Sequence, residues 1–181
     1  MTKTSDLFKD LTVTVGGLGH MRPASGTWGS TPPVIIWIIL VLSGVSPRSM
    51  TMTLVMLLLL VLSGAGCVAF GRWAEGKYGK KDPGQVVADE VAGQAIALMW
   101  LPILGLGFGP EWLSTIAPGI IAFLAFRMFD IIKIAPANQL QKVPFGWGIL
   151  LDDLFAGLYA NFGTQLGIIF IAVPLLNKIF P

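Results

Sequence analysis

The acidic residues of this sequence gather at the ends of its apolar stretches. Six of its ten carboxylates do so: Asp82, Asp89, Glu90, Asp130, Asp152 and Asp153. An ionised carboxylate near a bilayer is costly unless it is paired, hydrated or bound to a metal, so such residues mark functional sites. Two carboxylates roughly 5 Å apart, at an effective dielectric constant of about 20, repel by about 3 kcal/mol. Because Mg²⁺ binds oxygen ligands, the pattern indicates a magnesium site with these six residues as candidate ligands.

Two of the acidic groups also have a structural explanation that the sequence leaves open. Asp82 begins the string D-P-G-Q, in which Asp would cap a helix and Pro would occupy its first turn, so a capping role is favoured over metal binding. Asp89 and Glu90 could form ion pairs with Arg127 or Lys133 instead of binding a metal.

The last acidic pair, Asp152 and Asp153, lies near the expected start of a helix, where the helix dipole alone would stabilise negative charge. The accumulation of all these acids on one membrane face nevertheless favours a bound cation. We expect the catalytic residues to come from the same group, namely Asp89, Glu90, Asp130 and Asp153.

Basic residues near the acids suit an anionic substrate. Arg127 and Lys133 stand three residues before and after Asp130, on one helical face, where they could bind a phosphate or pair with Asp130. A glycine-rich segment over residues 16–31 is predicted to be a substrate loop whose backbone N–H groups could hold a phosphate. Arg22 and Thr27 in this loop are further candidates for substrate binding, although the loop lacks the G-K-[ST] of a Walker A motif.

Several phosphatase chemistries are excluded by the residues themselves. A cysteine phosphatase needs a thiolate followed six residues later by an arginine, but Cys67 is followed there by Trp73. Paired catalytic histidines cannot come from one histidine, His20, and no D-x-D nucleophile is present. Metal-dependent chemistry on an anionic group at a membrane surface remains.

The composition predicts an integral membrane protein. The chain has 181 residues, of which 54% are hydrophobic and 12% charged, with a mean hydropathy of +0.76. We expect a single all-α domain over residues 1–181: a polytopic membrane helical bundle with about five membrane-inserted helices and an interfacial N-terminal helix over residues 1–15. The expected spans, each about long enough for a ~30 Å bilayer core, are residues 32–46, 51–71, 86–106, 113–132 and 148–176.

The basic residues also predict an orientation. With the N-terminus in the cytoplasm, ten of the twelve lysines and arginines lie on the cytoplasmic side, against Arg48 and Lys178 outside. This asymmetry is a strong positive-inside signal. All three acidic groups then face the cytoplasm, and the C-terminus lies on the opposite side.

Four motifs resemble those of the phosphatidylglycerophosphatase A family, and they occur in the family's order. They are residues 22–30 (RPASGTWGS), 82–84 with 89–94 (DPG and DEVAGQ), 126–133 (FRMFDIIK) and 146–157 (GWGILLDDLFAG). The sequence departs from the family pattern at Ser25, Ala88, Ile134 and Gln141, none of which is a candidate ligand.

The resemblance implies a Mg²⁺-dependent enzyme that removes the terminal phosphate of phosphatidylglycerol phosphate. It also implies a bacterial inner-membrane location, a cytoplasm-facing active site, a phospholipid substrate and no nucleic-acid partner; oligomeric state stays open. The alternative is a cation-coupled transporter that uses the acids as an ion site. A transporter should carry its charges near the bilayer midplane, often within inverted repeats, whereas here the acids lie at one end of the spans.

Overall fold

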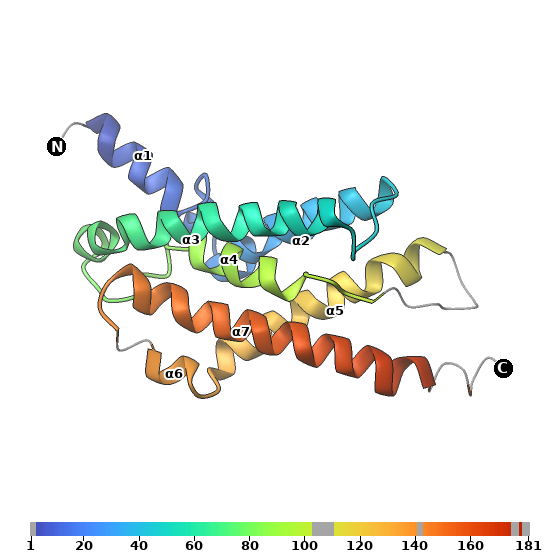
Figure 1. Ribbon diagram of the computed structural model, residues 1–181. Helices are drawn as coiled ribbons and strands as arrows, with labels where there is room; N and C mark the ends of the chain where they lie inside the picture. The colour runs from blue at the N-terminus through green and yellow to red at the C-terminus, as the bar shows by residue number, and fades with distance from the viewer. Residues whose placement is uncertain (1–2, 103–110, 141–142, 175–177, 179–181) are drawn as a thin grey trace.

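The computed structural model describes residues 3–102, 111–140, 143–174 and 178, and this part of the chain is helical without a β-strand (Figure 1). This confirms the expected all-α membrane bundle. The elements in chain order are α1 (Lys3–Val13), η1 (Leu18–His20), α2 (Ser25–Leu42), α3 (Met50–Tyr78), α4 (Ala88–Ala97), α5 (Glu111–Ile132), α6 (Ala137–Leu140), α7 (Gly146–Gly167) and the π-helical η2 (Ile168–Ala172).

Four helical stretches are long and apolar enough to cross a membrane: α2, α3, residues 114–132 of α5, and α7 continued by η2. The third expected span, residues 86–106, is not a full helix. Its helix α4 has ten residues and is therefore about 15 Å long, half the thickness of a bilayer core. The expectation of five helical spans is thus approximate, because the described chain supplies four.

The chain nevertheless passes through the bundle at this place, partly without helical structure. After α4, the carbonyl oxygen of Trp100 accepts a hydrogen bond from Arg48 Nε at 3.4 Å, at the far end of the bundle where α2 connects to α3. Leu98 and Leu101 are fully buried. Irregular backbone at membrane depth is tolerated only where protein surrounds it. Leu98, Met99 and Leu101 meet that condition, whereas the Trp100 side chain is 52% exposed.

The side chain of Asn161 in α7 binds backbone carbonyl groups at the C-terminal end of α4. Its Nδ2 donates to the carbonyl oxygens of Ile96 and Ala97, both at 3.2 Å, and of Met99 at 2.7 Å. Gln165, one turn further along α7, donates to Asn161 Oδ1 at 2.7 Å and so orients the amide. The carbonyl groups that a helix end leaves without partners are therefore bound by a side chain, which explains why α4 can stop inside the bundle.

Helix α4 lies at the centre of the bundle, packed against α2, α3 and α7. Glycines permit this close approach, as is common between membrane helices. A Cβ atom on Gly157 of α7 would overlap the backbone carbonyl of Gly93 in α4, and one on Gly93 would lie 2.5 Å from the carbonyl oxygen of Asp153. The middle of α4 and the stretch of α7 from Asp153 to Gly157 are thereby held side by side.

Several predicted element boundaries are wrong. Helix α4 begins at Ala88 after Val87, and Asp82 has a left-handed backbone (φ +50°), so Asp82 is not its N-cap. Helix α2 begins at Ser25, so the glycine-rich loop is shorter than residues 16–31. Helix α3 continues through the basic stretch to Tyr78, and α7 begins at Gly146, more than a turn before its acids.

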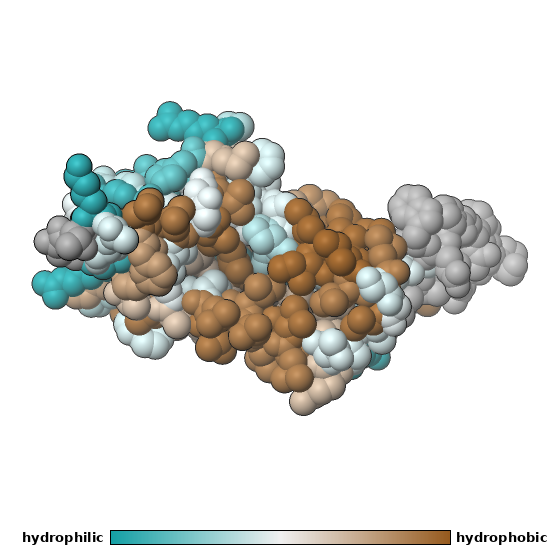
Figure 2. All heavy atoms as spheres, turned by 90° about the horizontal axis from the view of Figure 1, so that it is seen from above, coloured by the Kyte–Doolittle hydropathy of each residue, from teal (hydrophilic) through white to brown (hydrophobic). Residues whose placement is uncertain are grey.

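The N-terminal helix is present and attached to α3. Asp10 accepts hydrogen bonds from Lys77 Nζ and Tyr78 Oη, both at 2.5 Å, and His20 Nε2 lies 3.3 Å from its other carboxylate oxygen. Leu7 and Phe8 are 57% and 64% exposed, as an interfacial helix requires, although contact with a bilayer stays a prediction. Figure 2 shows hydrophilic residues gathered at this end of the molecule and hydrophobic residues over most of the remaining visible face.

Candidate active site

Two helices bring the central carboxylates together. Asp89 stands in the first turn of α4, and Asp152 and Asp153 stand in the second turn of α7, against which α4 is tightly packed. Their exposed fractions are 6%, 4% and 3% respectively, so these acids are buried between helices near one end of the bundle. A buried carboxylate requires a cation or several hydrogen bonds.

Arg127 supplies one cation from α5. Its Nη1 lies 2.9 Å from Asp130 Oδ2 and 3.8 Å from Glu90 Oε1, and it donates a hydrogen bond to Ser30 Oγ at 3.3 Å. The pairing of Arg127 with Asp130 along one helix, one of the two interpretations that the sequence left open, is therefore present. The guanidinium also joins α5 to α4 through Glu90, an ion pair that the sequence left open. Its link to α2 through Ser30 had no signal in the spacing of the charged residues.

Lys133 supplies a second cation just beyond α5. Its Nζ lies 2.8 Å from Asp152 Oδ2, so it pairs with α7. Burial alone would favour the neutral amine, but the hydrogen bond and the charge of Asp152 outweigh it and raise the pKa of Lys133. The lysine is therefore held in its charged form.

The start of α2 packs directly against Glu90. A Cβ atom on Gly26 would overlap Glu90 Oε1, and one on Gly29 would lie 2.7 Å from Glu90 Oε2. The sequence predicted that these residues belong to a substrate loop, and this contact with Glu90 was not predicted. Their spacing in the sequence carries a signal: Gly29 and Ser30 stand three and four residues after Gly26, on the same side of a helix.

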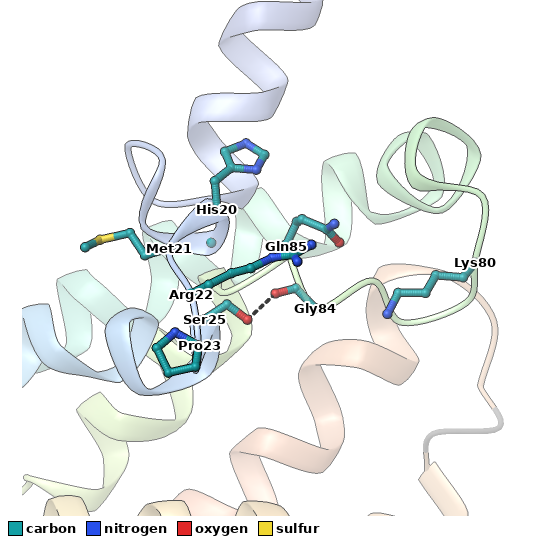
Figure 3. A pocket seen from close by; sticks show the side chains of 9 residues that line it. His20, Met21, Arg22, Pro23, Ser25, Lys80, Gly84 and Gln85 are labelled. Atoms are coloured by element: carbon teal, nitrogen blue, oxygen red, sulfur yellow. Dashed lines mark hydrogen bonds between the residues drawn. The ribbon is translucent and has the colours of Figure 1, made fainter.

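The remaining predicted residues lie around this core. Thr27 is half-buried in the first turn of α2, while Asp82 is exposed on the segment before α4. Arg22 does not reach the buried acids and is exposed in the loop before α2. There it lines a pocket with Lys80, beside a 2.6 Å hydrogen bond from Ser25 Oγ to the carbonyl oxygen of Gly84 (Figure 3).

The donor chemistry fits a hard divalent cation, although the side chains do not converge on one point. Within the described ranges, no three acidic, histidine or cysteine side chains are arranged to hold a metal ion. Buried Asp89 Oδ1 and Glu90 Oε2 have no hydrogen-bond partner in the described part of the chain. Since Mg²⁺ often binds through one or two carboxylates together with water and substrate phosphate, these two oxygens are the strongest candidates for it.

The comparisons with known proteins decide the class of enzyme. The sequence profile described as phosphatidylglycerophosphatase A matches residues 11–168. The chain belongs to the phosphatidylglycerophosphatase A family. As a member of this family it is a phosphatase, which confirms the enzyme interpretation over the transporter alternative.

Two curated relatives of this phosphatidylglycerophosphatase A family member are similar over most of their length. A Haemophilus influenzae protein named "Phosphatidylglycerophosphatase A" is 34% identical over 149 residues, which cover 80% of this chain and 78% of the relative. A Bacteroides thetaiotaomicron protein named "Putative phosphatidylinositol-3-phosphatase" is 32% identical over 149 residues, covering 80% and 83%. No solved structure matches the chain significantly.

Proposed function

We propose that this membrane phosphatase hydrolyses the terminal phosphate of phosphatidylglycerol phosphate to phosphatidylglycerol and inorganic phosphate, with Mg²⁺ as cofactor, at the cytoplasmic face of a bacterial inner membrane. The observation that carries the proposal is the group of buried carboxylates and two cations at one end of four apolar helices in a member of this family. A lipid headgroup can reach that end while its acyl chains stay in the bilayer.

The side chains divide the work of hydrolysis between them. Arg127 and Lys133 bind the phosphoryl oxygens and offset their negative charge as the phosphorus–oxygen bond to glycerol breaks. Asp130 orients Arg127 through their 2.9 Å contact, and Asp152 does the same for Lys133. Magnesium, when bound, supplies further positive charge to the phosphate oxygens.

The attacking water needs a base, and Asp89 and Glu90 are the candidates. Each has a buried carboxylate oxygen without a hydrogen-bond partner among the described residues, so either oxygen could accept a proton from water. Asp153 is buried in the same group on α7. Its negative charge favours the transfer of a proton from water to the neighbouring carboxylate. Water's oxygen bonds to phosphorus and its proton passes to the carboxylate. The glycerol oxygen leaves with the bonding pair and takes up that proton, which returns the carboxylate to its charged form.

A covalent aspartyl-phosphate is the competing route. A single-turnover reaction that is quenched, treated with borohydride, digested and analysed by mass spectrometry separates the two. Direct attack by water forms no acyl phosphate and leaves every site aspartate unchanged. Reduction of a site aspartate to homoserine would instead establish the covalent intermediate.

The activity itself is tested by phosphate release from purified protein in detergent micelles. We expect release from phosphatidylglycerol phosphate with Mg²⁺, and its loss on chelation and return on adding the metal. Phosphatidylinositol 3-phosphate, suggested by the name of the Bacteroides thetaiotaomicron relative, is the comparison substrate. Faster turnover of that lipid, or release unaffected by chelation, would contradict the proposed substrate or the proposed cofactor respectively.

A further inference from the structure

A basic pocket lies beside the buried acids, between the loop that precedes α2 and the segment that precedes α4. It has a volume of about 370 Å³, and its described lining includes Arg22, Lys80, Ser25 and Gln85 but no carboxylate. Figure 3 shows Arg22 lying across the pocket and Lys80 directed toward it from the opposite wall. Two cations that converge on one hollow without an acid between them suit a phosphate group.

An apolar groove continues from this pocket along the outer surface of α2. It has a volume of about 380 Å³ and is lined by Leu18, Met21, Trp28, Pro32 and Ile35, among others. Met21 lines both hollows, so the basic pocket and the groove adjoin. Because α2 is one of the helices long and apolar enough to cross a membrane, an apolar groove along it suits an acyl chain.

The basic pocket also adjoins the catalytic group. Ser25 lines the pocket, and the next residue, Gly26, packs against Glu90 and Arg127. Ser25 Oγ bonds to the Gly84 carbonyl and ties the two walls of the pocket together. The buried acids, the basic pocket and the apolar groove therefore follow one another around the start of α2.

We propose that these three sites bind the three chemical parts of one phospholipid substrate. The terminal phosphate lies at the acids, the phosphodiester lies between Arg22 and Lys80, and one acyl chain lies in the groove along α2. Arg22 and Lys80 are then specificity-determining residues, which select lipids with a phosphodiester in addition to a terminal phosphate. This inference rests on the proposed function, because it assumes a lipid phosphomonoester at the acids.

The first test compares two lipids that differ in this group. Phosphatidylglycerol phosphate carries both phosphates, whereas phosphatidic acid has only the terminal one. The double variant Arg22→Gln/Lys80→Gln should lower kcat/KM for phosphatidylglycerol phosphate about tenfold or more, because hydrogen bonds to charged groups are lost. Its kcat/KM for phosphatidic acid should change less than about twofold.

Lys81→Gln is the matched control, because Lys81 is exposed next to Lys80 but does not line the pocket. It removes the same type of charge and should leave the preference between the two lipids unchanged. An equal fall for both lipids in the double variant, or no fall for either, would overturn the assignment of Arg22 and Lys80.

The second test needs neither magnesium nor turnover. Phosphatidylglycerol with brominated acyl chains should quench the fluorescence of Trp28, with Trp28→Phe identifying that contribution among the six tryptophans. Brominated diacylglycerol, which lacks the phosphodiester, should quench Trp28 less. The Arg22→Gln/Lys80→Gln variant should remove the difference between the two lipids.

Variants on α2 test the groove itself. Ile35→Gln should weaken the quenching of Trp28 because Ile35 lines the groove, while Ile39→Gln, exposed one turn further along α2 and outside the groove, should not. Equal quenching by both lipids in the wild-type protein would mean general contact with lipid and would overturn the proposal. If the quenching shows the expected lipid binding but phosphatidylglycerol phosphate is not hydrolysed, only the proposed function is contradicted.

Discussion

Arg127 contacts side chains from three helices, which makes it both a structural and a functional residue. Its guanidinium bonds to Ser30 of α2 and lies beside Glu90 of α4 and Asp130 of its own helix. Removing one member of a buried ion pair is costly because the partner's charge stays buried. The same cation is placed to bind a phosphate, so stability and activity have to be measured separately.

Arg127→Gln should destabilise the protein by about 3 kcal/mol or more, since Glu90 and Asp130 lose their cation. The double variant Arg127→Gln/Glu90→Gln should recover part of this loss because one uncompensated charge is removed. Thermal unfolding in detergent measures both, with Lys81→Gln as the surface control. Equal stabilities of the single and double variants would show that the Glu90 contact is unimportant.

Asp89→Asn should lower kcat by about a hundredfold or more, in the range expected for loss of a base or a ligand, while the protein stays folded. The substitution keeps the size of the side chain and removes its charge. Asp6→Asn is the control, because Asp6 lies in α1 and accepts a hydrogen bond from Trp73 away from the acids. Near-normal turnover at low Mg²⁺ by both Asp89→Asn and Asp152→Asn would disprove a shared metal site.

At the scale of elements, two features fix the short helix α4 and therefore the position of Asp89 and Glu90. Glycines let α4 lie close to α7, and Asn161 binds the carbonyl groups at its C-terminal end. A full-length helix in this place would require no such side chain. The arrangement buries the first turn of α4 against α2 and α7 together, which is what places Glu90 beside Gly26.

Gly93→Ala should destabilise the protein by about 1–3 kcal/mol, because the new methyl group would meet the Asp153 carbonyl and the Phe126 ring, both within 2.6 Å. Gly76→Ala is the matched control: it is also helical, but nothing lies within 4 Å of its added Cβ. The control should be stabilised by about 0.5–1 kcal/mol. Thermal unfolding that ranks the two variants in the opposite order would contradict the packing of α4 on α7.

The docking of α1 should depend on pH. Burial favours the neutral Asp10 carboxyl, but hydrogen bonds from Lys77, Tyr78 and His20 outweigh it and lower its pKa below the ordinary value of 3.8. A lowered folded-state pKa contributes stability that is complete above about pH 4 and is lost as the pH falls through the lowered value. The stability difference between wild type and Asp10→Asn should therefore be constant near neutrality and shrink below about pH 4.

Proteolysis within residues 3–13 offers a local measurement of this docking. Asp10→Asn should be cleaved faster than wild type at neutral pH, and Asp6→Asn, which keeps the Asp10 contacts, should be affected less. A stability difference that grows on acidification would contradict the role given to Asp10.

At the scale of the whole molecule, the number of times the chain crosses the bundle decides whether the start of α2 and the end of α7 lie at the same end of it. Helices α2, α3, α5 and α7 cross the bundle, and α4 with residues 98–102 makes a further passage between α3 and α5 (Figure 1). The start of α2 and the end of α7 with η2 therefore lie at opposite ends. The basic asymmetry then predicts that the acidic end faces the cytoplasm.

Cysteine labelling in cells tests this orientation. Gly76→Cys, at the acidic end of α3, should resist a membrane-impermeant reagent added from the periplasm, whereas Ser46→Cys, exposed in the α2–α3 connection, should react. The native Cys67 is buried and provides the unlabelled background. The reverse labelling pattern would invert the proposed orientation of the active site.

The sequence alone determined the class of fold, the acidic and basic residues of the candidate site and the family. These follow from local properties: hydropathy over a span, charges beside it and short motifs such as residues 146–157. The N-terminal helix follows from the sequence for the same reason, and the Arg127–Asp130 pair is one of two interpretations that the spacing allows, since neighbours along one helix are set by its periodicity.

Only the tertiary structure decided how long α4 is and what its acids touch. An apolar run of about twenty residues predicts a full span, but the helix ends early because Asn161, more than sixty residues later, binds its carbonyls. The contact of Gly26 with Glu90 and the pairing of Lys133 with Asp152 likewise join separate helices. Such contacts depend on how helices pack side by side, and the spacing of residues along one chain does not encode that directly.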